Sequence, residues 1–251
     1  MIMDTLGFVL LLVVSFLSSI IGTMIGTAML FLPPTMIFLG VPVYTAIATA
    51  RFSMVGMGVG NITKFSLKDK IQFKYVLPFA IAGVIGSVMG ASFMTKINAE
   101  LLKRVIGVLM VIVALLIMFE GYIKPKKRAP KIKVKHHFLS ILSGLFIGAY
   151  IGIIGGGGAT LIIFLLILIY GLGFHDALVN QKVITLPISI ITTIIFIYQG
   201  LIDYKLGLPL LATNVIGGWV GASLILKFNN AWLKRLLVPV IIIMAIKLIL
   251  Y

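Results

Sequence analysis

Long runs of apolar residues, nearly free of charge, are the feature that most constrains how this chain can fold. Examples are Thr5–Ile21, Val76–Thr95 and Val183–Ile202. At a rise of about 1.5 Å per residue, helices of this length approach the roughly 30 Å hydrocarbon core of a bilayer. The runs lack the strict alternation of apolar and polar residues that membrane β-strands require. The sequence therefore predicts an all-α polytopic membrane protein.

Composition supports this interpretation and excludes several classes of function. Of the 251 residues, 61% are hydrophobic and 11% are charged, which leaves too little polar surface for a soluble domain. The net charge of +15 would suggest a nucleic-acid partner in a soluble protein. Here the apolar runs make the lipid bilayer the expected partner, and we expect no nucleic acid. With no cysteine and six acids, we expect no metal site, no cofactor and no enzymatic activity.

The two halves of the chain resemble each other at a fixed offset of 131 residues, without a gap. Glycines, prolines and basic residues coincide more often than shared apolar composition explains. The sequence therefore predicts two homologous helical repeats, residues 1–120 and 138–251. Identical pairs at this offset include Gly26 and Gly157, Gly40 and Gly171, Lys74 and Lys205, Pro78 and Pro209, Gly86 and Gly217, and Lys103 and Lys234.

A basic segment, residues 121–137, links the repeats. It carries seven lysines and arginines between Lys124 and Lys135 and no acid in that stretch. Because cytoplasmic loops are enriched in Lys and Arg, we expect residues 124–135 to be cytoplasmic in a multi-pass protein of the cell (inner) membrane. The first run lacks the basic flank of a signal peptide, and we expect it to be a retained span.

Each half is predicted to contain a discontinuous opening segment and three fuller spans, about 8 to 10 membrane segments in all. An opening segment such as Leu6–Leu39 is too long for one straight crossing and too short for two complete ones. If it re-enters or forms two short spans, the repeats are inverted; if it is one broken crossing, they are parallel. The distribution of basic residues slightly favours inverted repeats.

Both opening segments are interrupted by small residues, over 22–28 and 152–160. Non-helical backbone within a membrane is tolerated where it lines a cavity, and matching breaks in two halves point to a transporter's binding site. A helix that restarts after a break presents free N–H groups to an anion. The alternative is that the glycines allow close helix packing. The predicted binding residues at the breaks are Gly26, Thr27, Gly155, Gly156, Gly157 and Gly158.

A repeat-related pair of cations, Arg51 and Lys182, falls inside predicted spans. Ionisable residues at that depth are costly and are candidates for function by default. The alternative is that both side chains snorkel to the interface. We predict that Arg51, Lys182, Asn180 and Thr185 bind the anion. Ser189 and Thr192 lie on the Lys182 face and Asn61 on the Arg51 face, and Gln181 adds a further donor in the second half.

Together these motifs resemble the TauE/SafE-like sulfite exporter family, also called the toluene sulfonate uptake permeases. The resemblance spans almost the whole chain and rests on the glycine breaks, Gly40-Val-Pro42, the Ala46–Ala50 run before Arg51, and Asn180-Gln-Lys182. The break in the first half carries fewer glycines than the family pattern. The resemblance implies a secondary permease for sulfite, thiosulfate or organosulfonates.

The leading hypothesis places the anion between the two repeats near the midplane, with alternating access by rocking of one repeat against the other. The alternatives are an anion channel and a carrier for another small anion. Coupling to protons or another ion, and assembly into a homo-oligomer, are left open.

Overall fold

A computed structural model describes residues 5–65, 72–119, 134–225 and 231–250. Within these ranges the regular elements are all helical, and the predicted all-α fold is confirmed. The elements, in chain order, are α1 (Thr5–Ile25), η1 (Ala28–Leu30), α2 (Leu32–Phe38), α3 (Val43–Phe65), α4 (Phe73–Phe93), η2 (Met94–Lys96), α5 (Ala99–Phe119), α6 (Val134–Ile153), α7 (Gly158–Tyr170), α8 (Phe174–Tyr198), α9 (Tyr204–Ile225) and α10 (Ala231–Leu250).

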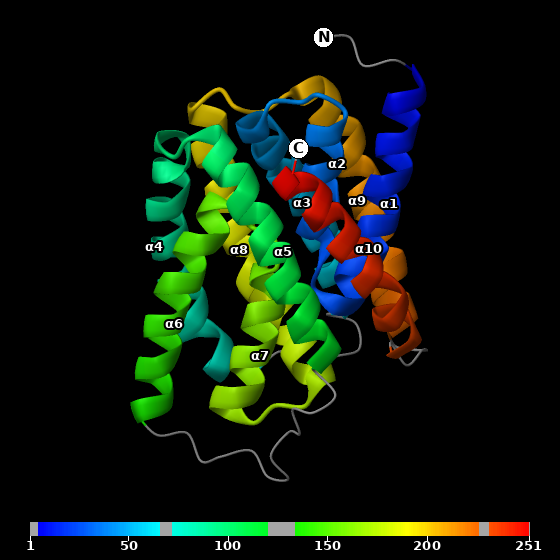
Figure 1. The fold of residues 1–251 in the computed structure, drawn as a ribbon. Helices are drawn as coiled ribbons and strands as arrows, with labels where there is room; N and C mark the ends of the chain where they lie inside the picture. Colours follow the sequence, from blue (N-terminus) through cyan, green and yellow to red (C-terminus); the bar gives the residue numbers. More distant parts are fainter. Residues whose placement is uncertain (1–4, 66–71, 120–133, 226–230, 251) are drawn as a thin grey trace.

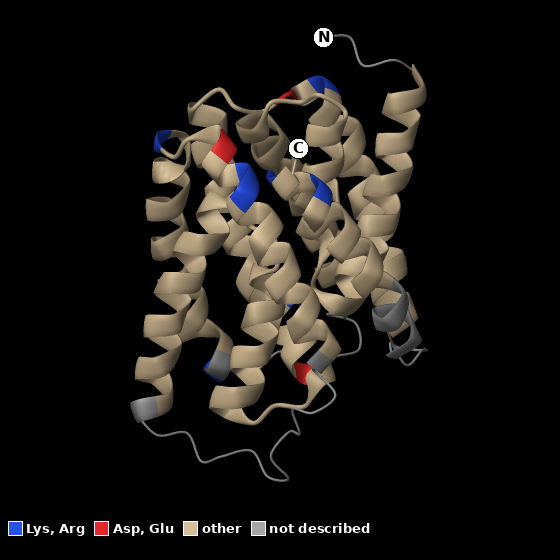
Figure 2. Ribbon diagram, viewed as in Figure 1, with Lys and Arg blue, Asp and Glu red and all other residues tan. Residues whose placement is uncertain are grey.

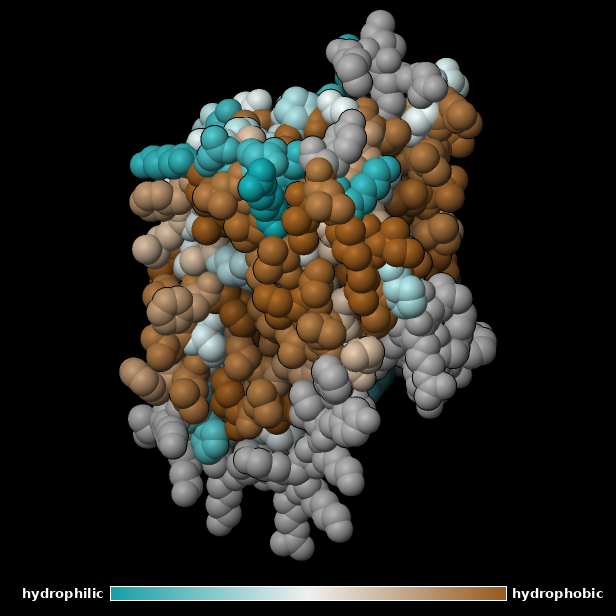
Figure 3. Space-filling view, viewed as in Figure 1, coloured by the Kyte–Doolittle hydropathy of each residue, from teal (hydrophilic) through white to brown (hydrophobic). Residues whose placement is uncertain are grey.

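Six of the described helical segments are long and apolar enough to cross a membrane. Apolar side chains form a broad band across the face shown in Figure 3, with polar residues gathered at its upper end. Helix α3 is long enough but is not among the six; it contains Arg51, Asn61 and Lys64. The six segments are Thr5–Ile25, Val76–Lys96, Ala99–Met118, His136–Ile153, Phe174–Tyr198 and Tyr204–Ile225.

The opening segment of each half is a helix that stops at glycine and returns as a shorter helix. Helix α1 is followed by Gly26, at φ +89°, and then by η1 and α2. Helix α6 is followed by Gly155 and Gly157, at φ +78° and +77°, and then by α7. These left-handed conformations favour glycine because a Cβ atom there is strained. The predicted glycine breaks are therefore present in both halves.

Two pairs of helices that the 131-residue offset relates, α1 with α6 and α5 with α10, run in opposite directions. In Figure 1, α1 and α5 run downward, whereas α6 and α10 run upward. Helix α6 begins at Val134, so residues 134–137 of the expected linker are helical rather than extended linker. The remainder of that linker, 121–133, lies outside the described residues.

The helices pack into two bundles that mix the sequence halves. We name the first the α3 bundle: α1, α2 and α3 from the first half, with α9 from the second. We name the other the α8 bundle: α6, α7 and α8 from the second half, with α4 from the first. The two bundles meet mainly where α3 contacts α8. Helices α5 and α10 pack on each other across the front of the molecule (Figure 1).

Glycines allow the closest approaches inside the bundles. A Cβ atom added at Gly86 or Gly90 of α4 would lie 2.0 Å from a backbone oxygen of α6. The equivalent atoms at Gly217 and Gly221 of α9 would lie 2.8 Å from backbone oxygens of α1. These four glycines allow close helix packing, because any side chain there would push the helices apart.

Candidate functional site

A cavity lies between the two bundles and is lined from both sides. Its volume is about 50 Å³, several times the roughly 10–15 Å³ that one water molecule requires on the same measure. The lining comes from α1, η1, α3, α6, α7, α8 and the two glycine breaks. Its polar and glycine members are Gly22, Gly26, Arg51, Gly58, Asn61, Gly155, Gln181, Lys182, Thr185 and Ser189.

Arg51 reaches the cavity from α3 and contacts the opposite bundle. Its side chain is buried, with 4% of its surface exposed, and its Nη2 donates a hydrogen bond of 2.8 Å to the Ile151 carbonyl near the end of α6. The buried Nε of the same guanidinium has no partner. Since a buried donor without an acceptor is costly, this N–H favours a ligand that carries an acceptor.

Lys182 reaches the cavity from α8 and makes the reciprocal contact. It is 3% exposed, and its Nζ donates a hydrogen bond of 2.9 Å to the Gly22 carbonyl near the end of α1. Arg51 thus binds the C-terminal end of α6, and Lys182 binds the C-terminal end of α1. In each case this is the negative end of the helix dipole. Arg51 and Lys182 are therefore held inside the protein, and neither snorkels to the membrane surface.

Two amides add polar atoms without partners to the cavity wall. Asn61 accepts a hydrogen bond of 2.8 Å from the Thr23 hydroxyl, while its Nδ2 is buried and unpartnered. Gln181 donates from Nε2 to the Thr185 hydroxyl at 2.9 Å, while its Oε1 is buried and unpartnered. The residues that line the cavity therefore include two unused buried donors, the Arg51 Nε and the Asn61 Nδ2.

The second glycine break shapes the wall beside the guanidinium. A Cβ atom at Gly155 would lie 1.6 Å from the Arg51 Nη2, so only glycine leaves room for this side chain. Helix α7 restarts at Gly158, and its second residue, Ala159, lines the cavity. The N-terminal turn of α7 therefore adds partial positive charge to the same wall.

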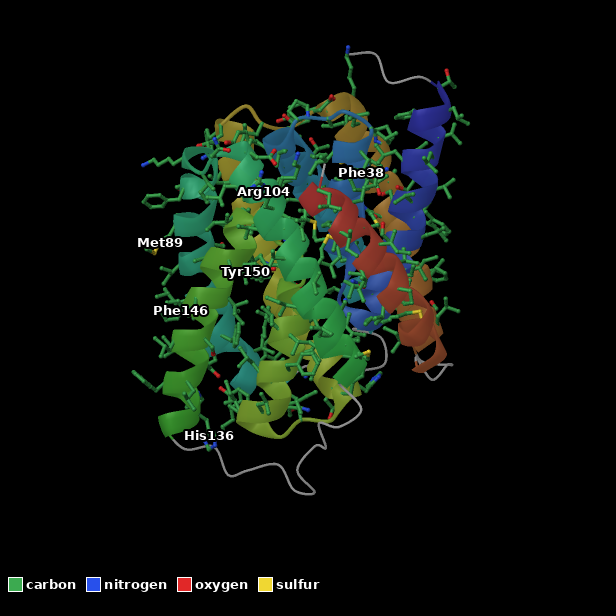
Figure 4. All side chains as sticks on the ribbon, in the orientation of Figure 1. Phe38, Met89, Arg104, His136, Phe146 and Tyr150 are labelled. Carbon is green, nitrogen blue, oxygen red and sulfur yellow. The ribbon has the colours of Figure 1, made fainter. Side chains whose placement is uncertain are left out.

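Tyr150 of α6 supports the second glycine break. Its hydroxyl donates to the Gly156 carbonyl. In Figure 4, Tyr150 lies between Arg104 near the upper end of the molecule and His136 at the lower end. The break that Tyr150 contacts therefore lies between the two ends of the molecule.

Five of the predicted binding residues line the cavity: Gly26, Arg51, Gly155, Lys182 and Thr185. The structure places the other five outside the lining. Asn180 is buried and accepts a hydrogen bond of 2.8 Å from the Gln72 N–H just before α4. Thr27 is buried before η1, Gly156 accepts from Tyr150, Gly157 precedes α7 and packs beside Val113, and Gly158 packs beside Ile151.

Three groups at the site were not predicted. Two are the Gly22 and Ile151 carbonyls, because a backbone acceptor leaves no signal in the sequence. The third is Tyr150, whose position two residues before the Gly152–Gly158 break was a usable signal. Asn61 was placed on the correct helix face by its spacing from Arg51, but it was not among the predicted ligands.

Acidic residues are absent from the cavity lining. Among the described residues, neither Arg51 nor Lys182 forms an ion pair; the ion pairs found join Glu100 to Lys103 and Arg104 at the upper end of the molecule (Figure 2). In the same part of the chain, no group of three His, Asp or Glu residues could hold a metal ion. The cavity therefore combines two buried cations with no fixed counter-charge.

Comparison with known proteins points to a membrane transporter. The family model described as "Sulfite exporter TauE/SafE" matches residues 8–248. A probable membrane transporter protein of Haemophilus influenzae is 22% identical, over 92% of this chain and 89% of its own length. Similar proteins are the probable membrane transporter proteins YdhB of Bacillus subtilis, 25% identical over 78% of this chain and 79% of its own, and ORF9 of Sinorhizobium, 23% identical over 95% and 91%.

Proposed function

The chain belongs to the TauE/SafE sulfite exporter family of membrane transporters, and from this premise we propose that it carries small sulfur-containing oxyanions across the membrane. It is a multi-pass membrane protein. The anion binds in the cavity between the α3 and α8 bundles, where Arg51 and Lys182 face it from opposite sides.

One observation carries this proposal: two buried cations share a cavity that contains no carboxylate. A charge removed from water is costly unless it is paired, and the backbone carbonyls that accept from these side chains only partly compensate. An oxyanion in the cavity would neutralise the charge. Its oxygens would also accept from the unpartnered Arg51 Nε and Asn61 Nδ2.

The size and composition of the wall favour a small tetrahedral or pyramidal oxyanion. A volume of about 50 Å³ accommodates an ion such as sulfite or thiosulfate more readily than a bulky sulfonate. The donors come from several directions, which suits an anion with three or more oxygens. Met29, Met54 and Met57 complete the wall with polarisable thioethers.

The orientation of the helices supports inverted repeats as part of this proposal. Helices α1 and α6, and likewise α5 and α10, run in opposite directions (Figure 1), and the first residues of α4 and α9, Phe73 and Tyr204, are 131 residues apart. Inverted repeats are typical of secondary carriers and less so of simple channels. We place the basic segment 124–135 in the cytoplasm on the basis of the positive-inside rule.

Uptake by the purified protein in proteoliposomes tests the proposal. We expect saturable uptake of sulfite or thiosulfate and loss of that uptake in Lys182→Gln, with Lys64→Gln as the control. Lys64 is also a cation on a membrane helix, but it lies over the Trp219 ring rather than in the cavity. An imposed pH gradient tests proton coupling in the same vesicles. Full uptake by Lys182→Gln, or non-saturating flux, would contradict the proposed carrier.

A further inference from the structure

The two sequence halves have exchanged one helix each. Helix α4 belongs to the first half but packs along α6 and α8 of the second. Helix α9 belongs to the second half but packs along α1 and α3 of the first. A hydrogen bond of 2.9 Å from the Ser19 hydroxyl to the Asn214 carbonyl joins α1 to α9, and one of 3.3 Å from Gln199 to the Ala91 carbonyl joins α8 to α4.

These exchanged interfaces are too intimate to separate during a transport cycle. The backbones of α4 and α6 are in close contact. Cβ atoms added at Gly86, Gly90 and Gly148 would lie about 2 Å from a backbone oxygen of the facing helix. Sliding such close-packed surfaces would break many contacts at once, since packed interiors are not continuously deformable. Rocking of one sequence half against the other would have to break such contacts both around α4 and around α9.

The junction between the two bundles follows the cavity, and its contacts differ from those between α4 and α6. At its α3–α8 contact, the three atoms nearest to a Cβ atom added at Gly58 belong to the flexible Leu186 side chain rather than to backbone. Three hydrogen bonds that join the bundles lie at the cavity or its glycine breaks. They are Arg51 to the Ile151 carbonyl, Lys182 to the Gly22 carbonyl, and the Thr160 hydroxyl to the Gly26 carbonyl at 3.3 Å.

We propose that the units that move in transport are the α3 and α8 bundles, not the sequence halves, and that Arg51 and Lys182 latch them together. This proposal rests on the proposed function and adds how the anion site controls the motion. The expected rocking of one repeat against the other is thereby replaced by motion at the α3–α8 junction.

The latch and the anion compete for the same donors. Each cation gives a hydrogen bond to a neutral carbonyl of the other bundle in the empty site. A charged oxyanion is the stronger acceptor, because bonds between two ionised groups are shorter and stronger than bonds to neutral ones. An anion that takes over Arg51 and Lys182 frees the Ile151 and Gly22 carbonyls and releases the junction. Anion binding and bundle separation are thus coupled through two side chains.

Disulfide cross-linking tests which units move, and the chain is suited to it because it contains no cysteine. Ala82→Cys with Gly144→Cys joins α4 to α6, inside the α8 bundle. The Cβ atoms would be 3.1 Å apart, below the roughly 3.5–4.5 Å range of disulfides, and the Gly144 Cβ would lie 2.8 Å from the Phe79 carbonyl oxygen, so α4 and α6 must separate slightly to accept this pair. The pair joins the two sequence halves, so its disulfide blocks rocking of one half against the other but leaves the two bundles free to move.

We expect the oxidised Ala82–Gly144 pair to keep most of the uptake of its reduced form. The single-cysteine variants control for the substitutions. Reversible loss of uptake on oxidation of the Ala82–Gly144 pair would overturn the proposal.

Spin-label distances supply a measurement that does not require the transported anion to be known. Labels at Met89 of α4 and Leu10 of α1, both exposed, share a sequence half but lie in different bundles. Labels at Met89 and the exposed Phe138 of α6 share a bundle but lie in different halves. We expect two populations or an anion-dependent shift for the first pair and one unchanged distance for the second. The reverse pattern, or two unchanging distances, would refute bundle motion even if uptake of every tested anion failed.

Discussion

Replacing Gly155 by alanine tests whether the position of Arg51, rather than its charge alone, is required for transport. The added Cβ atom would lie 1.6 Å from the Arg51 Nη2, so the guanidinium must move away from the Ile151 carbonyl. The arginine itself remains in the protein. The substitution therefore changes the geometry of the site while keeping its formal charge.

Two costs contribute to the effect. Alanine in the left-handed conformation at φ +78° costs about 1–2 kcal/mol. Loss of one hydrogen bond from the displaced guanidinium to the bound oxyanion costs about 1.5–3 kcal/mol more. At 1.4 kcal/mol for each factor of ten, the second cost corresponds to a decrease of roughly 10- to 150-fold in kcat/KM for uptake.

Gly200→Ala is the matched control. Gly200 also has a positive φ, +67°, and an added Cβ atom there would have no neighbour within 4 Å. Both variants therefore carry the backbone cost, and only Gly155→Ala displaces the arginine. Initial rates of sulfite uptake in proteoliposomes, together with thermal unfolding of both proteins, separate the two effects. Equal uptake by the two variants would refute the assigned role of Arg51.

Three further predictions concern single contacts. Asn61→Asp keeps an acceptor for the Thr23 hydroxyl but replaces the unpartnered donor with a negative charge. Thermal stabilisation of the protein by added sulfite should therefore disappear, and stabilisation equal to wild type would contradict this prediction. Tyr150→Phe removes the bond to the Gly156 carbonyl and should lower the Tm by roughly 2–4 °C, for about 1 kcal/mol; an unchanged Tm in a thermal scan would exclude a stabilising role. Gly86→Ala should cost about 1–3 kcal/mol by overpacking α4 against α6, whereas Gly173→Ala, with open space, should be close to neutral in the same denaturation assay; similar values would argue against close packing.

Much of the fold could be predicted because apolar runs and glycine breaks are local signals. The limits of the opening segments follow from Gly26, Gly155 and Gly157, where the backbone needs a conformation that other residues rarely adopt. The exchange of α4 and α9 could not be predicted. Helix pairing in a membrane depends on which small-residue faces meet, and Gly86 and Gly217 have the same spacing pattern in both halves.

The charged residues of the site could be predicted from the sequence, whereas its backbone acceptors could not. Arg51 and Lys182 stand out because an ionisable residue within an apolar run needs a reason to be there. Asn180 follows the same logic but lies outside the cavity, since helical rotation turns it toward Gln72. The carbonyls of Gly22 and Ile151 are common to every residue type. Only the three-dimensional structure could identify them as the acceptors.

The helix exchange between the bundles also determines how the protein can be assembled during synthesis. Helices α1 to α3 leave the ribosome early, yet their bundle stays open until α9 has been inserted, near the end of the chain. Until then Ser15 and Ser19 lack the Asn214 partner that buries them. Neither half made alone can therefore complete a bundle, and the two halves should mature only when synthesised together.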